Sequence, residues 1–163
     1  MPNNEERIIG IDPGFDRCGV AIIEKTGGKE KLLYSTCITT NIKDLHEKRL
    51  NKLGTELREI IGKWKPNSLA IEKLFFNVNQ KTAIKVAEAR GVIMYEASLA
   101  NLTVSEYSPQ AIKIAVTGYG KATKPQVESM VVRILGIKST KMLDDEMDAI
   151  AVGITHLASI RHI

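Results

Sequence analysis

The sequence has no apolar run that approaches the roughly 18 residues of a membrane-spanning helix. Its first residues, Met-Pro-Asn-Asn-Glu-Glu, lack the basic and apolar regions of a signal peptide. We therefore expect a protein that stays in the cytoplasm. Internal repeats, low-complexity tracts and linkers are also lacking, and 44% of the 163 residues are hydrophobic. This content can fill one core, so we expect a single domain spanning residues 1–163.

Cysteine is scarce, with Cys18 and Cys37 as the two representatives. They form no Cys-x-x-Cys pair and show no Cys/His spacing typical of a metal site, which favours two reduced, partly buried thiols without chemistry. Basic residues are in modest excess, with 23 Lys and Arg against 19 Asp and Glu. This excess suits a polyanionic ligand, although many soluble proteins are basic for solubility alone.

The order of the expected elements is typical of the α/β class. Strands are expected at 7–12, 18–24, 31–40, 68–72 and 103–107. Helices are expected at 44–64, 79–102, 109–116 and 144–160. A further amphipathic helix, which contains Val127 and Leu135, is expected after a Gly-rich connection at 117–124. The short connections between the first three strands favour an antiparallel meander, and the later strands alternate with helices.

Three apolar segments each meet an acid, at Asp12, at Glu72 and in the run 144–148. A carboxylate at the tip of a buried strand is costly to desolvate unless a positive charge compensates it. Asp12 and Glu72 both end expected strands, and they would share one edge of the sheet if those strands are neighbours. The first turn of the last helix could complete the cluster. The sequence therefore predicts an acid-lined metal site.

Each acid also has an ordinary structural explanation. Acids in the first turn of a helix favour its dipole, and an Asp before Pro-Gly commonly forms a turn. Glu72 is harder to explain in this way, because Glu is rare at the end of a strand as apolar as 69–71. Spacing alone leaves open whether Asp144 or Asp145 shares a helix face with Asp148.

Four motifs in order carry a resemblance to a known family. They are Ile-Asp-Pro-Gly at 11–14, Ala-Ile-Glu at 70–72 followed by Phe75, Gly-x-Gly-x-x-x-Lys-x-Gln-Val-x-x-Met-Val at 118–131, and Asp-x-x-Asp-Ala-x-Ala at 145–151 with Thr-His at 155–156. This order resembles the RuvC family of Holliday junction resolvases over nearly the whole chain. The resemblance implies an RNase H-like fold, with a mixed five-stranded sheet flanked by helices.

The resemblance also implies a catalytic and metal-binding tetrad of Asp12, Glu72, Asp145 and Asp148, with Asp144 as its neighbour. Such a tetrad would hold two Mg²⁺ ions about 4 Å apart, with Mn²⁺ as a substitute, and these would clamp the attacking water and the leaving 3′ oxygen. The expected reaction is hydrolysis of a DNA strand to 5′-phosphate and 3′-hydroxyl ends.

By the same resemblance, Lys113 and Lys124 match basic residues that contact the DNA backbone, and Phe75 matches an aromatic residue that stacks on a base. We add Lys121, in the Gly-rich connection, to this DNA-binding set. Lysines can neutralise phosphates without reading bases, and stacking on an aromatic ring contributes about 1 to 3 kcal/mol per base. Without the resemblance, solvated helix lysines and a core Phe would be the simpler interpretation.

The family is dimeric and acts on four-way junctions, so we expect a homodimer on four-way junction DNA, with the RuvA–RuvB branch-migration complex as a further partner. The small residues Ala83, Ala87 and Gly91 recur every four positions and permit close helix approach, either in internal packing or at a dimer interface. We predict that helix 79–102 lies near the interface of the homodimer. The chain departs from the family at 15–18, where Phe-Asp-Arg-Cys replaces a Thr-containing turn. Asp16 and Arg17 are candidates for contact with the scissile phosphate.

Three other functions are compatible with parts of the pattern. Actin-like ATPases share the Ile-Gly-Ile-Asp turn, but they need two such domains, and this chain is too short. A YqgF-like RNase H-fold nuclease acting on RNA is a nearer alternative, which Phe75 and the segment 118–124 disfavour. A non-catalytic junction-binding module is the third, and the presence of all four acids counts against it.

Overall fold

The computed structural model describes residues 5–75, 80–138 and 142–160. Its five strands are β1 (Glu6–Asp12), β2 (Arg17–Thr26), β3 (Lys29–Thr39), β4 (Ser68–Glu72) and β5 (Thr103–Tyr107). They form one mixed sheet in the order β3-β2-β1-β4-β5. The pairs β1–β2 and β2–β3 are antiparallel, whereas β1–β4 and β4–β5 are parallel. The expected meander and α/β plan are therefore confirmed.

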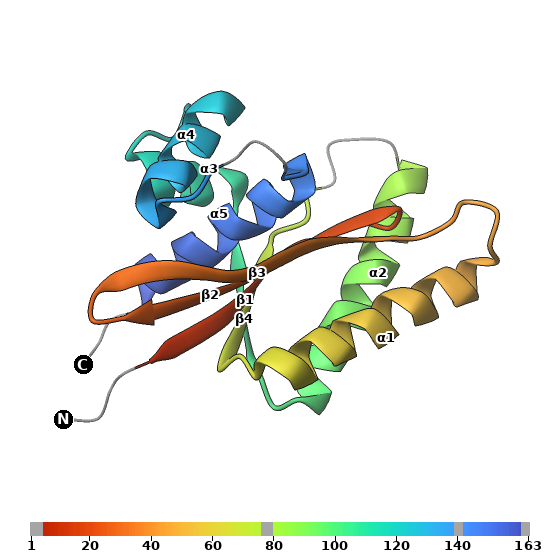
Figure 1. Cartoon of the computed structure of the whole chain (residues 1–163). Helices are drawn as coiled ribbons and strands as arrows, with labels where there is room; N and C mark the ends of the chain where they lie inside the picture. Colours follow the sequence, from red (N-terminus) through yellow and green to blue (C-terminus); the bar gives the residue numbers. More distant parts are fainter. Residues whose placement is uncertain (1–4, 76–79, 139–141, 161–163) are drawn as a thin grey trace.

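Helices cover both faces of this sheet (Figure 1). One face carries α1 (His46–Trp64) and α2 (Gln80–Leu99), and the other carries α3 (Pro109–Thr117), α4 (Lys124–Leu135) and α5 (Asp144–Ser159). Among the described residues, no helix is both long enough and apolar enough to cross a membrane.

The helix boundaries follow local capping chemistry. The hydroxyl of Ser108 accepts the backbone N–H of Ala111 at 3.1 Å and so caps α3, and Thr123 forms a reciprocal capping box with Gln126 at the start of α4. The predicted end of α2 at 102 is wrong, because Asn101 adopts a left-handed backbone with φ of 56° and terminates the helix after Leu99. The predicted start at 79 lies outside the described residues.

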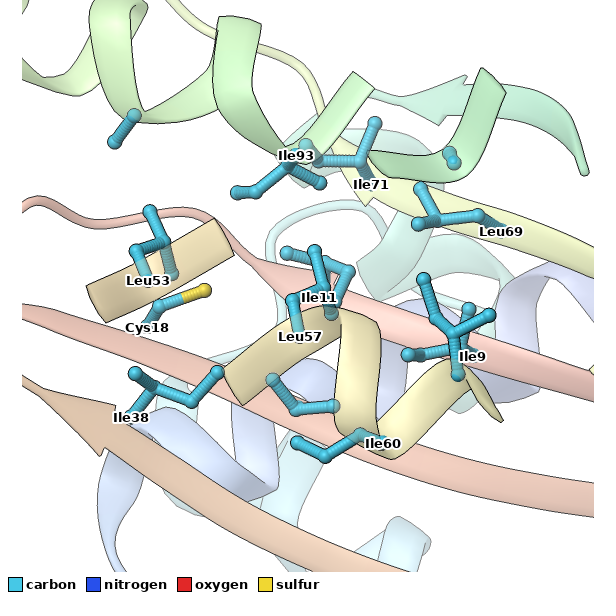
Figure 2. Packing of buried hydrophobic residues seen from close by; sticks show 14 of the residues in the cluster. Ile9, Ile11, Cys18, Ile38, Leu53, Leu57, Ile60, Leu69, Ile71 and Ile93 are labelled. Atoms are coloured by element: carbon cyan, nitrogen blue, oxygen red, sulfur yellow. The ribbon is translucent and has the colours of Figure 1, made fainter. Parts of the chain in front are cut away.

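Two apolar layers, one on each face, bury the sheet completely at its centre. Ile8, Ile9 and Ile11 of β1 are all 0% exposed, because the first faces α5 and the other two face α1 and α2. A strand covered on both faces is continuously apolar rather than alternating, which explains this sequence. Figure 2 shows the layer under α1 and α2, including Leu57 of α1 and Ile93 of α2.

Helix α5 lies directly against the backbone of β1 and β2. A Cβ atom added to Gly10 would lie 2.3 Å from the carbonyl oxygen of Ala149, and one added to Gly19 would lie 1.9 Å from that of Asp145. Both distances are far below van der Waals contact, so only glycine permits this approach. As a result, the first turns of α5 sit over the ends of β1 and β2.

We predict that Gly19→Ala lowers the free energy of unfolding by at least about 2 kcal/mol, because the new methyl group would overlap a helix backbone that cannot move aside without unpacking α5. Chemical denaturation measures this change. The matched control is Gly62→Ala in α1, where an added Cβ meets nothing within 4 Å. That variant should be unchanged or more stable by up to about 1 kcal/mol, and equal effects of the two substitutions would contradict the account.

Candidate active site

The two strand-end acids lie side by side. Strands β1 and β4 are parallel neighbours with Ile11 opposite Ile71, so the residues that follow, Asp12 and Glu72, emerge together at the carboxyl edge of the sheet. The condition for a shared edge, that these two strands are neighbours, is therefore met. In a parallel arrangement this edge is where ligands collect.

The carboxyl group of Asp12 is held in an unfavourable environment for a charge. Burial, followed by repulsion from Asp148, Glu72 and Asp145, raises the pKa of Asp12 from 3.8 to about 8. Burial and the nearby Asp148 also raise the pKa of Glu72. These shifts mean that the protein itself compensates only part of the negative charge that would gather at this edge, which is the condition that a bound cation relieves.

The acids of α5 are directed to different partners. Asp145 forms an ion pair with Arg17 at 2.7 Å, and its Oδ2 atom lies 3.8 Å from the sulfur of Cys37. Asp148 accepts a hydrogen bond from Nζ of Lys124 at 3.2 Å. Asp144 is 78% exposed and lies 3.6 Å from the same Lys124 amine. Of these three acids, Asp145 and Asp148 act on the pKa of Asp12.

Glu146 is occupied elsewhere. Its carboxylate accepts hydrogen bonds from the hydroxyl of Ser35 at 2.8 Å and from the backbone N–H of Leu143 at 3.0 Å. It therefore ties the start of α5 to β3, and it is not available to the acidic centre.

The donor set fits a hard divalent cation, since every group is a carboxylate oxygen. Across the residues that the structure describes, however, no three His, Cys, Asp or Glu side chains converge closely enough to share one ion. In this structure Asp145 is paired with Arg17 and Asp148 with Lys124.

A pocket of about 210 Å³ adjoins the acids on the side of α3 and α4. Glu72 and Asp148 line it together with Lys113 and Lys124. The structure thus places two of the predicted DNA-binding lysines in direct continuity with two predicted metal ligands. Lys121 is exposed in the connection before α4 and is not among the residues of this surface.

Phe75 is 53% exposed, so the alternative of a core Phe is wrong. It lies three residues beyond Glu72. Between them, the backbone N–H of Lys73 donates a hydrogen bond to the carbonyl of Tyr107 at 2.7 Å and so extends the pairing of β4 with β5. An aromatic ring exposed to solvent three residues after Glu72 is available for stacking.

Sequence reasoning missed Arg49. This residue is 6% exposed and forms an ion pair with Asp16, which accounts for one of the two residues left open in the turn. Arg17, the other, contacts Asp145. Cys37 was given no role, yet it lies beside the same pair. No local motif marks Arg49, because its partner is distant in the sequence and only the fold brings the two together.

Comparison with known proteins decides the family. A family model described as "Crossover junction endodeoxyribonuclease RuvC" matches residues 8–156. The chain belongs to the RuvC family. A RuvC of Halothermothrix orenii is 44% identical over 154 residues, which cover 94% of this chain and 93% of that protein. A RuvC of Brachyspira hyodysenteriae is also 44% identical, over 153 residues and 94% of each chain.

Solved structures agree with the RuvC assignment. The structure described as "T. thermophilus RuvC in complex with Holliday junction substrate" superposes with a TM-score of 0.89 at 30% identity, covering 93% of both chains. The yeast mitochondrial Holliday junction resolvase Ydc2 gives a TM-score of 0.71 at 11% identity, covering 94% of this chain and 78% of that one, a likeness in fold alone. The predicted RNase H-like fold is confirmed.

The raised pKa of Asp12 predicts a pH dependence of stability for the protein kept in a metal chelator. Between the unfolded pKa of 3.8 and the folded value of about 8, the folded state holds a proton that the unfolded state has lost. Folding stability therefore falls as pH rises through this window. Asp12→Asn removes the cost, so it should stabilise the protein at about pH 9 by at least about 1 kcal/mol more than at about pH 5.

Chemical denaturation of wild type and variant at both pH values measures this difference. Groups that do not interact with Asp12 cancel, including His156, whose pKa is lowered by burial. An equal stabilisation or destabilisation at both pH values would show that Asp12 carries no such cost.

Proposed function

We propose that this chain is a structure-selective endonuclease that resolves four-way DNA junctions by paired, symmetric nicks. The observation that carries the proposal is the meeting of Asp12 and Glu72 at one edge of the sheet, with Asp145 and Asp148 close enough to raise the pKa of Asp12. The similarity to the RuvC that was solved with a Holliday junction substrate supports the same substrate.

The four carboxylates are the groups that would hold divalent metal, which we propose is a pair of Mg²⁺ ions that Mn²⁺ can replace. When bound, such ions activate a water and stabilise charge on the leaving 3′ oxygen, giving 5′-phosphate and 3′-hydroxyl ends. Arg17 and Lys124 now neutralise Asp145 and Asp148. A bound metal would neutralise these two acids instead and would leave Arg17 and Lys124 free to contact phosphate.

The remaining predicted residues would hold the DNA. Lys113 and Lys124 line the surface next to the acids and can neutralise backbone phosphates, with Lys121 further along the same connection. The exposed ring of Phe75 can stack on a base that loses its neighbour when a junction opens. None of these contacts requires a particular base, which is consistent with recognition of shape.

Incubation with a synthetic four-way junction and Mg²⁺ tests the reaction. We expect paired symmetric nicks from the wild type. Asp12→Asn should reduce cutting by about 10³-fold or more and preserve binding, because it removes a metal ligand without removing a DNA contact. The matched control is Asp144→Asn at the exposed neighbouring acid, for which we expect a loss of less than about 10-fold.

Other outcomes identify the alternatives. Cleavage of RNA in place of the junction would indicate the YqgF-like function, and binding without cutting by the wild type would indicate a non-catalytic module. Loss of binding with Asp12→Asn would mean that this acid has a structural role.

A homodimer is the proposed assembly, since two opposed nicks need two centres related by a two-fold axis. The outward face of α2 supports this proposal. It is apolar and exposed at Ile84 (62%), Tyr95 (61%) and Leu99 (56%), with the small exposed residues Ala87 and Gly91 between them. A face of this kind is typical of an interface. Partnership with the RuvA–RuvB complex stays a prediction.

Gly91→Gln should weaken the dimer by at least about 10-fold, because a side chain would project from the centre of the apolar face. An added Cβ meets nothing within 4 Å at Gly91 or at Gly62 of α1, so Gly62→Gln is a matched control that should leave assembly unchanged. Sedimentation at micromolar concentration measures both. A wild-type monomer that stays monomeric on junction DNA would overturn the homodimer.

A further inference from the structure

A second pocket has a volume of about 370 Å³. It lies on the face of the sheet that α1 and α2 cover, whereas the pocket with Lys113 and Lys124 lies on the face that α3, α4 and α5 cover. It is lined by residues 14–17, which lead from β1 into β2, and by Lys81 and Lys85 of α2 together with the residues beside them. We call it the turn pocket. Its residues 15–17 belong to the segment 15–18, where the sequence departs from the pattern that the resemblance implies.

The floor of the turn pocket is held in place from below. Arg49 of α1 lies 3.8 Å from the centre of the Phe15 ring, and its Nε donates to the hydroxyl of Thr40 at 3.0 Å. That hydroxyl donates to the carbonyl of Phe15 at 2.9 Å. Phe15 and Arg49 are only 7% and 6% exposed. The turn is therefore fixed by packing before any ligand arrives.

The charge of the turn pocket is positive. Its one acid, Asp16, is already paired with Arg49 beneath it. Lys81 and Lys85 remain, since within the described ranges no carboxylate lies within 4 Å of either amine, whereas Arg17 is shared with Asp145. The Lys85 amine sits 5.4 Å from the Phe15 ring centre, which favours a position over the pocket. Three cations around a preformed hollow suit an anionic oxygen ligand.

The turn pocket is continuous with the acidic centre. Arg17 lines the pocket and also contacts Asp145 at 2.7 Å. On the other side of the centre, Glu72 and Asp148 line the surface that contains Lys113 and Lys124. The acids thus lie between two basic hollows, each contributed by elements on a different face of the sheet. A strand whose scissile phosphate meets the acids has to leave the centre on both sides.

We propose that the turn pocket binds backbone phosphate of the cleaved DNA strand, through Arg17, Lys81 and Lys85, on the side of the acidic centre opposite to Lys113 and Lys124. This inference rests on the proposed nuclease function and adds a second strand-holding site to it. Arg17 links the two, because a phosphate that draws its guanidinium into the pocket releases Asp145. Lys81 and Lys85 position the strand and touch no proposed metal ligand.

Binding of the full chain to a four-way junction in Ca²⁺, which slows cutting, tests the pocket. Lys81→Gln with Lys85→Gln should weaken binding and lower the slope of log affinity against log salt by about 2, one unit for each lost phosphate contact. The matched control is Lys29→Gln with Lys31→Gln, two exposed lysines on the hairpin at the opposite end of the sheet. This control removes the same charge, and its slope of log affinity against log salt should stay within about half a unit of the wild-type slope.

A scan of the cleaved strand with single neutral methylphosphonates locates the contact. At one or two phosphates near the scissile position, the methylphosphonate should weaken junction binding by the wild type. It should have little further effect on junction binding by the Lys81/Lys85 variant. Equal losses from both lysine pairs, or additive losses at every phosphate, would overturn the pocket. Cutting of the junction by the wild type is scored separately, so the pocket can fail while the nuclease function stands, and the reverse.

Discussion

The contact between the backbone of α5 and the glycines of β1 and β2 is the constraint on which the site depends. Gly10 and Gly19 leave no room for any side chain, and α5 fills that space with its own carbonyl oxygens. The helix therefore begins directly over the strand ends, and its first two turns deliver Asp145 and Asp148 to the edge where Asp12 and Glu72 emerge. A helix held further out by ordinary side-chain packing could not place its acids there.

That placement is electrostatically costly, and the protein offsets only part of the cost. Arg17 and Lys124 each neutralise one acid of α5, while the strand-end acids stay close to one another and partly buried. Uncompensated charge of this kind is characteristic of a site that takes a cation. The same two basic residues extend outward into the hollows on either side of the acids. The acids proposed to bind metal and the basic residues proposed to bind DNA thus form one connected arrangement of charges.

Much of this arrangement could be read from the sequence, because its signals are local. Strand β4 and strand β5 have the predicted boundaries, since apolar runs bounded by turn residues mark them clearly. The pattern also places Asp12 and Glu72 at strand ends, but the fold alone shows that their strands are neighbours. The choice between Asp144 and Asp145 needed a family resemblance, since both satisfy helical spacing. The pairs Arg49–Asp16 and Arg17–Asp145 could not be predicted, because each joins residues that only the fold brings together.

An anomalous difference map from crystals of the full chain grown with Mn²⁺ tests the central claim most directly. We expect density enclosed by the carboxylates of Asp12, Glu72, Asp145 and Asp148, with Asp145 turned away from Arg17 and Asp148 away from Lys124. Mn²⁺ density absent from this edge of the sheet at saturating metal, with both ion pairs intact, would contradict it.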